Sequence, residues 1–324
     1  RVVRRNGGSR RESYRGISKS DLGHPCESDW CGTGGPAILY LSFTDDRIMP
    51  SNTLADDSLN YRLRSNLIGF QTIVIKEVTR LLRIWPQTIV PPVITTTLYF
   101  IIFGKVIGSR VGEMGGVPYM QFIVPGLVMM SVINSSYQNV VSSFLSSKFQ
   151  RNVEEILISP MHNAFVLLGY MAGGIARAMV IGTIVLLVSL FFVDTLSIYS
   201  IPITFTVALL TATLFSIAGF INALLARKFD DIAIIPTFVL TPLTYLGGVF
   251  YPISLLPLPW ETISRFNPIV YMVSAFRSGI LKDRLDPAMI DINLGFAFGV
   301  ILLFIVGLFS LGLWMLNRGI GLRS

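Results

Sequence analysis

Charged residues are scarce in this chain. Lys, Arg, Asp and Glu make up 14% of its 324 residues, whereas 52% of the residues are hydrophobic. Such a composition leaves little room for a separate soluble domain. The formal charge of +7 is spread along the chain, and no basic run is interleaved with stacking aromatic residues. This distribution argues against nucleic-acid binding.

Residues that ligate metals or act as nucleophiles are also rare. Cys26 and Cys31 are not spaced as a CxxC pair, and no histidine ligands accompany them as in a zinc site. The two histidines, His24 and His162, do not supply a cluster of catalytic groups. We therefore predict no catalytic residue, no metal site and no cofactor bound by this chain.

The phosphate-binding loop GxxxxGK[ST] is missing as well. Around Gly104 and Lys105, Tyr99 stands where the first glycine belongs, and Val106 replaces the Ser or Thr. The chain lacks this route to ATP hydrolysis, and we expect it not to be an enzyme. The apolar stretches also carry no Asp, Glu, Lys or His deep inside, so the usual relays of secondary transporters are missing. If the chain pumps, its energy comes from a partner.

What the chain does have is six apolar stretches between Trp85 and Asn317, each about long enough to cross a bilayer. We predict an all-α membrane protein with spans at 87–107, 119–142, 164–192, 201–225, 232–251 and 293–316. Most Lys and Arg residues of the flanks fall on one side, so the positive-inside rule places both termini in the cytoplasm.

The segments before the first span differ in kind. Residues 1–48 are rich in Arg, Gly and Ser without periodicity, and we interpret them as an over-extended start before Met49 or as a disordered basic tail. A polar lead-in at 49–66 follows. In 67–85 apolar residues recur at helical spacing, with Lys76, Glu77, Arg80 and Arg83 on the other side, which predicts an amphipathic interfacial helix. The transmembrane domain then covers 86–324.

The predicted fifth span and the loop after it are irregular. Pro236, Pro242 and the pair Gly247 and Gly248 indicate a kinked fifth span. The loop 252–292 has an apolar middle at 269–281, which favours a short re-entrant helix in the outer leaflet. Such a helix requires protein or water to cover its backbone.

The loop between the second and third spans offers a docking surface. Residues 148–159 favour a short helix that ends before Pro160, with Phe149, Val153 and Ile156 on one face and the acidic pair Glu154 and Glu155 elsewhere. Such a helix fits a groove of a soluble subunit. The alternative is an interfacial helix with solvated carboxylates.

Several polar residues in the spans are candidates for a translocation pathway. Arg177 lies deep in the third span, where a charge is unfavourable unless it meets water or a partner; in a span this long it can also snorkel to the headgroups. The other candidates can line a route or join helices, and they are Asn134, Ser135, Thr241, Thr244 and Tyr245.

Four local strings resemble the ABC-2 type transporter permeases, particularly the bacterial inner-membrane branch with a separate ATPase. They are YMQFIVPG at 119–126, KFQRNVEE at 148–155, TPLTYLGGVFY at 241–251 and NPIVY at 267–271. The resemblance runs from about residue 65 to the C-terminus. It implies the type-2 ABC exporter fold, a homodimer in the plasma membrane, and a partner ATPase that binds ATP and Mg²⁺. It also makes the helix with Glu154 and Glu155 the coupling helix, together with Phe149, Arg151, Val153 and Ile156.

The resemblance thus implies the permease subunit of an ATP-binding cassette exporter. Two other classes of protein compete with this interpretation. A secondary, ion-coupled transporter predicts intramembrane acids or an inverted repeat, and neither is apparent in the sequence. A membrane enzyme or scaffold without an ATPase partner predicts a cluster of catalytic groups at one interface.

Overall fold

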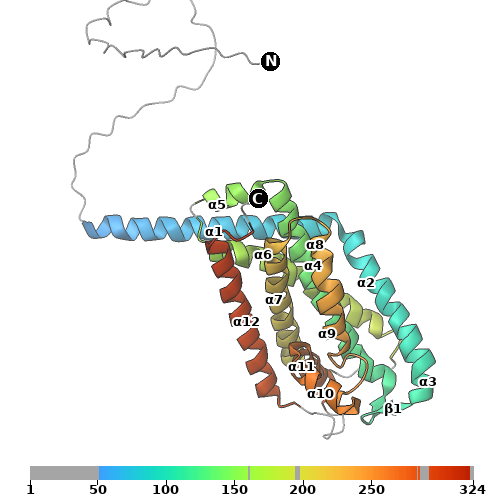
Figure 1. Cartoon of the computed structure of the whole chain (residues 1–324). Helices are drawn as coiled ribbons and strands as arrows, with labels where there is room; N and C mark the ends of the chain where they lie inside the picture. The colour runs from blue at the N-terminus through green and yellow to red at the C-terminus, as the bar shows by residue number, and fades with distance from the viewer. Residues whose placement is uncertain (1–50, 160, 194–197, 283, 285–291, 322–324) are drawn as a thin grey trace, which may run out of the picture. The chain divides into compact units, whose positions relative to one another are not determined.

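In the computed structural model, long helices run side by side and a further helix lies across one end of them (Figure 1). The structure describes residues 51–159, 161–193, 198–282, 284 and 292–321. The predictions for residues 1–48 lie outside these ranges. Residues Pro50–Ser324 form one compact unit.

The first half of this unit begins with α1 (Ser51–Arg83), which lies across the end of the bundle. It is followed by α2 (Trp85–Tyr99), a π-helical stretch (Phe100–Ile107) and α3 (Gly108–Val111). The strands β1 (Glu113–Met114) and β2 (Val117–Pro118) pair antiparallel and lead into α4 (Tyr119–Phe149). The short helix α5 (Asn152–Ile158) precedes α6 (Asn163–Ser189).

The second half begins with α7 (Ile201–Leu225). A broken helix follows, made of α8 (Asp231–Ile235), a π-helical turn (Pro236–Leu240) and α9 (Thr241–Tyr245). A 3₁₀ turn (Ile253–Leu255), α10 (Leu258–Arg265) and α11 (Pro268–Leu281) then precede α12 (Leu294–Asn317). The helices α1, α5 and α8 lie at one end, here called the α1 end, while α10, α11 and β1 lie toward the opposite end, the β1 end (Figure 1).

Within the described residues, four helices are long and apolar enough to cross a membrane: Trp85–Val111, Asn163–Ser189, Ile201–Leu225 and Leu294–Asn317. The helix α4 has the length but carries many Ser and Asn residues. The broken helix Asp231–Tyr245 extends only about 22 Å at 1.5 Å per residue, less than the hydrocarbon core of about 30 Å. The chain therefore has several membrane-crossing helices, and the count of six stays a prediction.

The fifth predicted span, 232–251, is wrong in length, because its helix ends at Tyr245. Pro236 and Pro242 occupy the first positions of the π-helical turn and of α9, where a missing N–H and a rigid ring interrupt the hydrogen-bond ladder. Gly248 then adopts φ +72°, a left-handed conformation that turns the chain. The helix is irregular where the kink was predicted, and the glycine pair lies beyond its end instead of inside it.

The helix α1 is longer than the predicted 67–85, since it begins at Ser51. Its amphipathic pattern is present, but Lys76, Glu77 and Arg80 of the polar side contact α4, while Arg83 remains exposed. Glu77 is only 2% exposed, whereas Leu67 and Leu82 are 59% and 68% exposed. This arrangement suits a helix at a membrane surface, because its apolar side chains can contact lipid while its polar side chains bind protein groups.

Two glycines of α6 allow α1 to lie directly on it. A Cβ atom at Gly169 would lie 2.8 Å from Ile73, and one at Gly173 would lie 2.6 Å from the Cβ atom of Glu77. This Gly-x-x-x-Gly pair therefore permits close contact between the two helices. By contrast, no atom lies within 4 Å of a Cβ built at Gly299.

We expect the substitution Gly173→Ala to destabilise the protein by about 1–3 kcal/mol, because the added methyl group displaces α1 from its buried position. The measurement is the midpoint of thermal unfolding of the purified chain in detergent. The matched control is Gly299→Ala, where the methyl group meets open space and the higher helix propensity of alanine leaves the midpoint equal or raised. Equal midpoints for the two variants would contradict the tight contact.

The predicted re-entrant segment 269–281 is helical as α11, one residue longer at its start. The side chain of Asn267 caps α11 by accepting a hydrogen bond of 3.0 Å from the N–H of Ile269, and its Nδ2 donates to the carbonyl of Leu243 at 2.5 Å. The residues buried along α11 pack in one cluster with residues of α4, α7 and α12. Protein therefore covers this short helix, as its predicted place requires.

Candidate functional site

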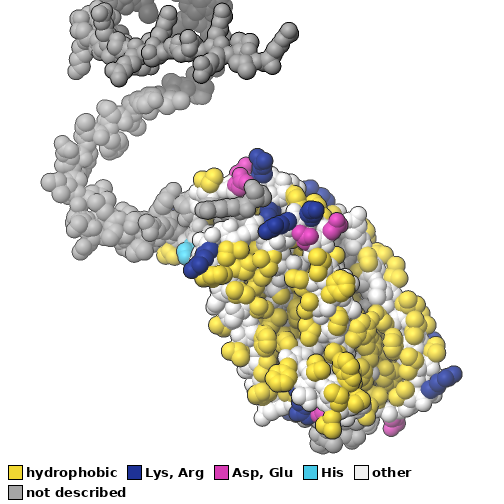
Figure 2. Space-filling view, viewed as in Figure 1, with side chains coloured by type: hydrophobic (Ala, Val, Ile, Leu, Met, Phe, Trp, Pro, Cys, Tyr) yellow, Lys and Arg dark blue, Asp and Glu magenta, His cyan; other side chains and the backbone are white. Residues whose placement is uncertain are grey.

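Charged side chains gather at the two ends of the bundle, and hydrophobic side chains cover the surface between them (Figure 2). This separation is typical of a protein that crosses a bilayer. At the α1 end, two loops carry exposed charges, the α4–α5 turn with α5, and the segment between α7 and α8. The first of these loops contains the residues that were predicted from the sequence to dock a partner.

The single helix predicted over 148–159 is wrong, because the chain breaks into two helices there. Phe149 is the last residue of α4, and Arg151 adopts φ 59°, a left-handed conformation that few residues other than glycine take. The helix α5 begins at Asn152, with Glu154 and Glu155 in its first turn. Carboxylates are favourable there because the helix dipole is positive at its N-terminus.

The apolar face of α5 belongs to the protein itself. Val153 is 3% exposed and lies in one buried cluster with Phe144 and Val166, and Ile156 packs against the same cluster. Val153 is therefore not accessible to a partner, whereas Phe149 is 49% exposed, and docking by this segment stays a prediction. The side chains of Glu154 and Glu155 are exposed, as is that of Arg151. The exposed surface of α5 thus carries two carboxylates and, at its end, Ile158, which is 84% exposed.

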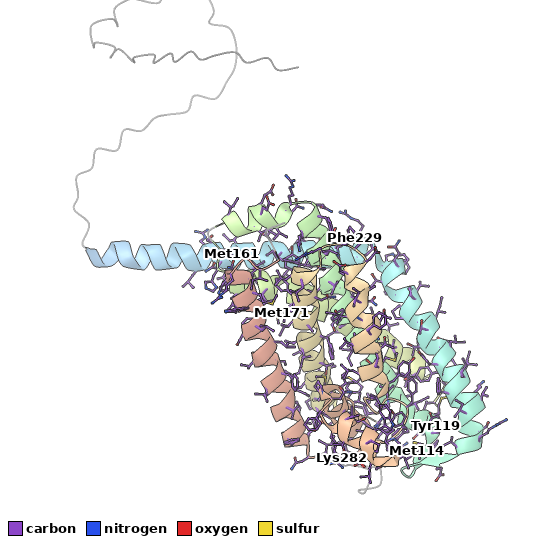
Figure 3. The ribbon with its side chains drawn as sticks, viewed as in Figure 1. Met114, Tyr119, Met161, Met171, Phe229 and Lys282 are labelled. Carbon is purple, nitrogen blue, oxygen red and sulfur yellow. The ribbon has the colours of Figure 1, made fainter. Side chains whose placement is uncertain are left out.

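An aromatic pair joins the two loops at this end. The rings of Phe149 and Phe229 stack with centroids 4.5 Å apart and planes at 13°, although both side chains are largely exposed. Next to them, Lys148 donates hydrogen bonds to the carbonyls of Leu224 at 3.2 Å and Ala226 at 2.7 Å, where α7 ends. Figure 3 labels Phe229 at the α1 end. The end of α4 is thereby held to the loop that leads into α8.

A cavity of about 300 Å³, lined by both polar and apolar side chains, lies between α2, α4 and α6. Three of the predicted pathway residues, Asn134, Ser135 and Arg177, line it together. A second cavity of about 440 Å³ shares Gln87, Gln138 and Arg177 with the first and extends to the start of the broken helix at Ile232, Ala233, Pro236 and Thr237. Arg177 therefore faces both spaces.

The structure does not bring the other predicted pathway residues to these cavities. Thr244 is buried and donates to the carbonyl of Leu240 at 2.7 Å, while the exposed Thr241 donates to that of Pro236 at 2.8 Å. The hydroxyl of Tyr245 lies 3.2 Å from that of Tyr99, which lines the first cavity. Tyr245 is thus linked to the cavity only through this contact.

A polar cluster between α1 and α4 lies beside Arg177, and it was not predicted. Lys76 donates to Ser147 at 2.8 Å, Ser143 hydrogen-bonds to the carboxylate of Glu77, and Arg80 donates to the Oδ1 of Asn139 at 3.1 Å. The pKa of Lys76 is lowered from its usual value, chiefly by burial. The carboxylate of Glu77 opposes this shift, and the charge of Arg80 adds to it. The sequence contains one signal for this cluster. Its partners on α4, Asn139, Ser143 and Ser147, are spaced four residues apart and therefore share one helix face.

Arg277 is a further residue whose structural role was not predicted from the sequence. It lies in the predicted re-entrant segment, to which the sequence assigned no charged partner; it is 7% exposed, and its guanidinium lies 3.9 Å from the ring centroid of Phe122. It donates to the carbonyl of Gly248 at 2.8 Å and to that of Val249 at 3.4 Å. Arg277 therefore holds the turn after α9 at the β1 end.

Among residues that the structure describes, no group of three or more His, Cys, Asp or Glu is arranged to hold a metal ion. The geometry instead provides a helix with exposed carboxylates at the α1 end, two cavities that share Arg177, and a broken helix that follows the α7–α8 loop.

Comparison with known proteins decides the family. The family model described as ABC-2 type transporter matches residues 68–281. The chain belongs to this family. It is 52% identical over 257 residues to the inner membrane transport permease YadH of Escherichia coli (strain K12), covering 79% of this chain and 98% of that protein.

More distant relatives carry the name nodulation protein J. The protein of that name from Rhizobium leguminosarum bv. trifolii is 28% identical over 184 residues, or 56% of this chain and 69% of the relative. The one from Rhizobium meliloti (strain 1021) is 26% identical over 225 residues, or 68% of this chain and 82% of the relative. As a member of the ABC-2 family with several membrane-crossing helices, the chain is a transporter permease subunit.

Proposed function

We propose that the chain is the permease subunit of an ATP-driven exporter in a bacterial inner membrane. Two copies form the translocation pathway, and a separate ATPase binds at the α1 end, which is cytoplasmic. This proposal rests mainly on α5, whose acidic side chains are exposed while its other face packs into the bundle. The name of the E. coli relative supports the location.

ATP hydrolysis is assigned to the partner because this chain has no phosphate-binding loop of the GxxxxGK[ST] type. ATP and Mg²⁺ therefore belong to the partner subunit. Glu154 and Glu155 present two carboxylates that basic or N–H groups of the partner can bind. Because these side chains are exposed, they are available without rearrangement of α5.

The packing around α5 gives its movement a route into the bundle. Val153 lies in the buried cluster that also contains Ile73 of α1, Phe144 of α4 and Val166 of α6. A force on α5 therefore acts on three helices at once, because closely packed interiors transmit strain. The ring pair of Phe149 and Phe229 extends the connection to the loop before α8.

The pathway is proposed to lie where α2 and the broken helix meet a second copy. Both elements expose polar residues at membrane depth, Gln87 and Thr95 on α2 and Thr237 and Thr241 on the broken helix. Polar side chains at such depth face water or protein instead of lipid. The π-helical turn at Pro236–Leu240 lets this helix change shape when the α7–α8 loop moves.

Affinity purification of the tagged chain in mild detergent tests the proposal. We expect an ATPase of soluble type to co-elute in about equal amount, with ATP hydrolysis in the eluted complex and none in the chain after the ATPase is removed. The measurement is identification by mass together with the rate of phosphate release. A chain recovered without any ATPase, from membranes in which its complex survives, contradicts the proposal and favours an ion-coupled transporter.

A further inference from the structure

The two cavities contain a single charged group. Among the described residues that line either cavity, Arg177 is the only Lys, Arg, Asp or Glu. The other side chains around it are amides, hydroxyls and apolar groups, including Gln87, Thr95 and Gln138. A space with hydrogen-bonding walls and one cation suits a negatively charged ligand.

The surrounding side chains do not neutralise Arg177. Glu77, the only carboxylate in the cluster beneath α1, lies 4.0 Å from Arg80. Within the described part of the chain, Arg177 makes no ion pair, and its one hydrogen bond is a long contact of 3.5 Å to the Oδ1 of Asn139, an atom that Arg80 also uses. The Nε of Arg177 is buried without a partner. Lys76 and Arg177 contact neutral side chains, Ser147 and Asn139, and only Arg80 lies within 4.0 Å of the Glu77 carboxylate.

The position of Arg177 along α6 indicates what kind of molecule carries the anionic group. The helix α1 rests on Gly169 and Gly173, and Arg177 follows one turn later, about 6 Å farther along the helix. The exposed apolar side of α1 is suited to the membrane interface. Arg177 is therefore at the depth of the lipid headgroups or just beneath them, where an amphiphile carries its charge.

We infer that the cavity at Arg177 binds the phosphate-type anionic headgroup of an amphiphile that enters from the membrane leaflet at the α1 end. Arg177 binds the anion, Gln87 and Gln138 offer amide hydrogen bonds, and the apolar chain remains among the exposed hydrophobic residues of α2. The inference deepens the proposed function, because such an amphiphile at the pathway is a substrate class for the exporter. Binding itself requires only this chain.

The test measures lipid retention by the purified full-length chain in a neutral detergent, by native mass spectrometry. The probes are phosphatidic acid and phosphatidylcholine with identical acyl chains. We expect the wild-type chain to retain phosphatidic acid about tenfold better, and Arg177→Gln to lose that preference, because one charge-assisted bidentate contact is removed. Arg177→Lys should retain most of the preference.

The matched control is Arg83→Gln, which removes an exposed cation of α1 and is expected to leave retention unchanged. If Arg177→Gln fails to elute as a folded protein, Gln138→Trp replaces it, because this exposed side chain lines both cavities and a bulky ring fills them with Arg177 intact. Equal retention of both lipids by the wild-type chain overturns the inference, as does an undiminished preference in these cavity variants.

A parallel arm separates a headgroup from a free anion. Inorganic phosphate is added to the wild-type chain and to Arg177→Gln, and the thermal midpoints are compared. Little stabilisation by phosphate, alongside selective retention of phosphatidic acid, supports the amphiphile. Stabilisation of only the wild-type chain by phosphate, without a lipid preference, overturns it in favour of a soluble anion. Because neither arm contains an ATPase, a failed lipid site is distinguishable from a failed exporter assignment.

Discussion

Reversal of both charges on α5, by Glu154→Lys together with Glu155→Lys, is expected to reduce the ATPase that co-purifies with the chain about a hundredfold. The loss follows because two carboxylates that attract a complementary surface become two cations that repel it. Charge pairs of this kind contribute about 2–5 kcal/mol when one partner is lost, and about 2.7 kcal/mol corresponds to a hundredfold change. The measurement is the molar ratio of ATPase to permease after purification.

Two controls isolate the role of α5. The thermal midpoint of the double variant should lie only slightly below that of the wild-type chain, because both side chains are exposed and lose only the favourable helix-dipole interaction, about 0.3–1 kcal/mol each. Asp230→Lys changes an exposed acid of the neighbouring α7–α8 loop, and Glu113→Lys changes one at the β1 end. Glu113→Lys should leave the ratio unchanged, and Asp230→Lys should have a smaller effect than the double variant. Wild-type yield of the complex in the double variant would rule out α5 as the docking element.

Replacement of Arg277 by leucine is expected to destabilise the protein by about 3 kcal/mol. The change removes the contact with the ring of Phe122 and leaves the carbonyl of Gly248 buried without its donor. A buried acceptor left unpaired is unfavourable by about 1–3 kcal/mol, and a desolvated cation–π contact contributes about 2 kcal/mol. The measurement is the thermal midpoint in detergent.

The same substitution also has a stabilising contribution, which opposes this loss. It removes a buried guanidinium that has no carboxylate beside it among the described residues. Arg277→Lys retains the charge but loses the planar stacking, so its midpoint should lie between those of the wild type and Arg277→Leu. Arg110→Leu, at an exposed position of α3, is the matched control and should change the midpoint little. A midpoint equal to or above that of the wild type in Arg277→Leu would mean that desolvation dominates and that Arg277 does not hold the turn.

The sequence predicted the apolar helices well where they are uninterrupted. The fourth predicted span, 201–225, coincides with Ile201–Leu225, and the sixth differs from Leu294–Asn317 by one residue at each end. Long apolar runs with Pro or Asn at their starts leave few alternatives for a backbone that must satisfy its own hydrogen bonds. The fifth span was predicted too long, because residues 246–251 are apolar whether they continue a helix or form a turn.

The predicted site was recovered only in part, because periodicity shows that a helix has two faces without showing what each face meets. Val153 has the spacing of a docking residue, but its neighbours in space come from distant helices. Glu77 and Arg277 have the charge of surface residues, but their partners lie 66 and 29 residues away along the chain. Asn134, Ser135 and Arg177 were selected because polar groups inside apolar stretches are conspicuous in the sequence, and the structure brings them to one cavity, while their place in a pathway stays a prediction.

The inward polar side of α1 also bears on how this protein is assembled during synthesis. Asn139, Ser143 and Ser147 make α4 a poor candidate for spontaneous insertion into lipid, and each of them contacts a side chain of α1. Because α1 precedes α4 in the chain, Lys76, Glu77 and Arg80 are synthesised before α4. The helix that lies across the bundle thus provides hydrogen-bonding partners for α4, the long bundle helix with the most Ser and Asn residues.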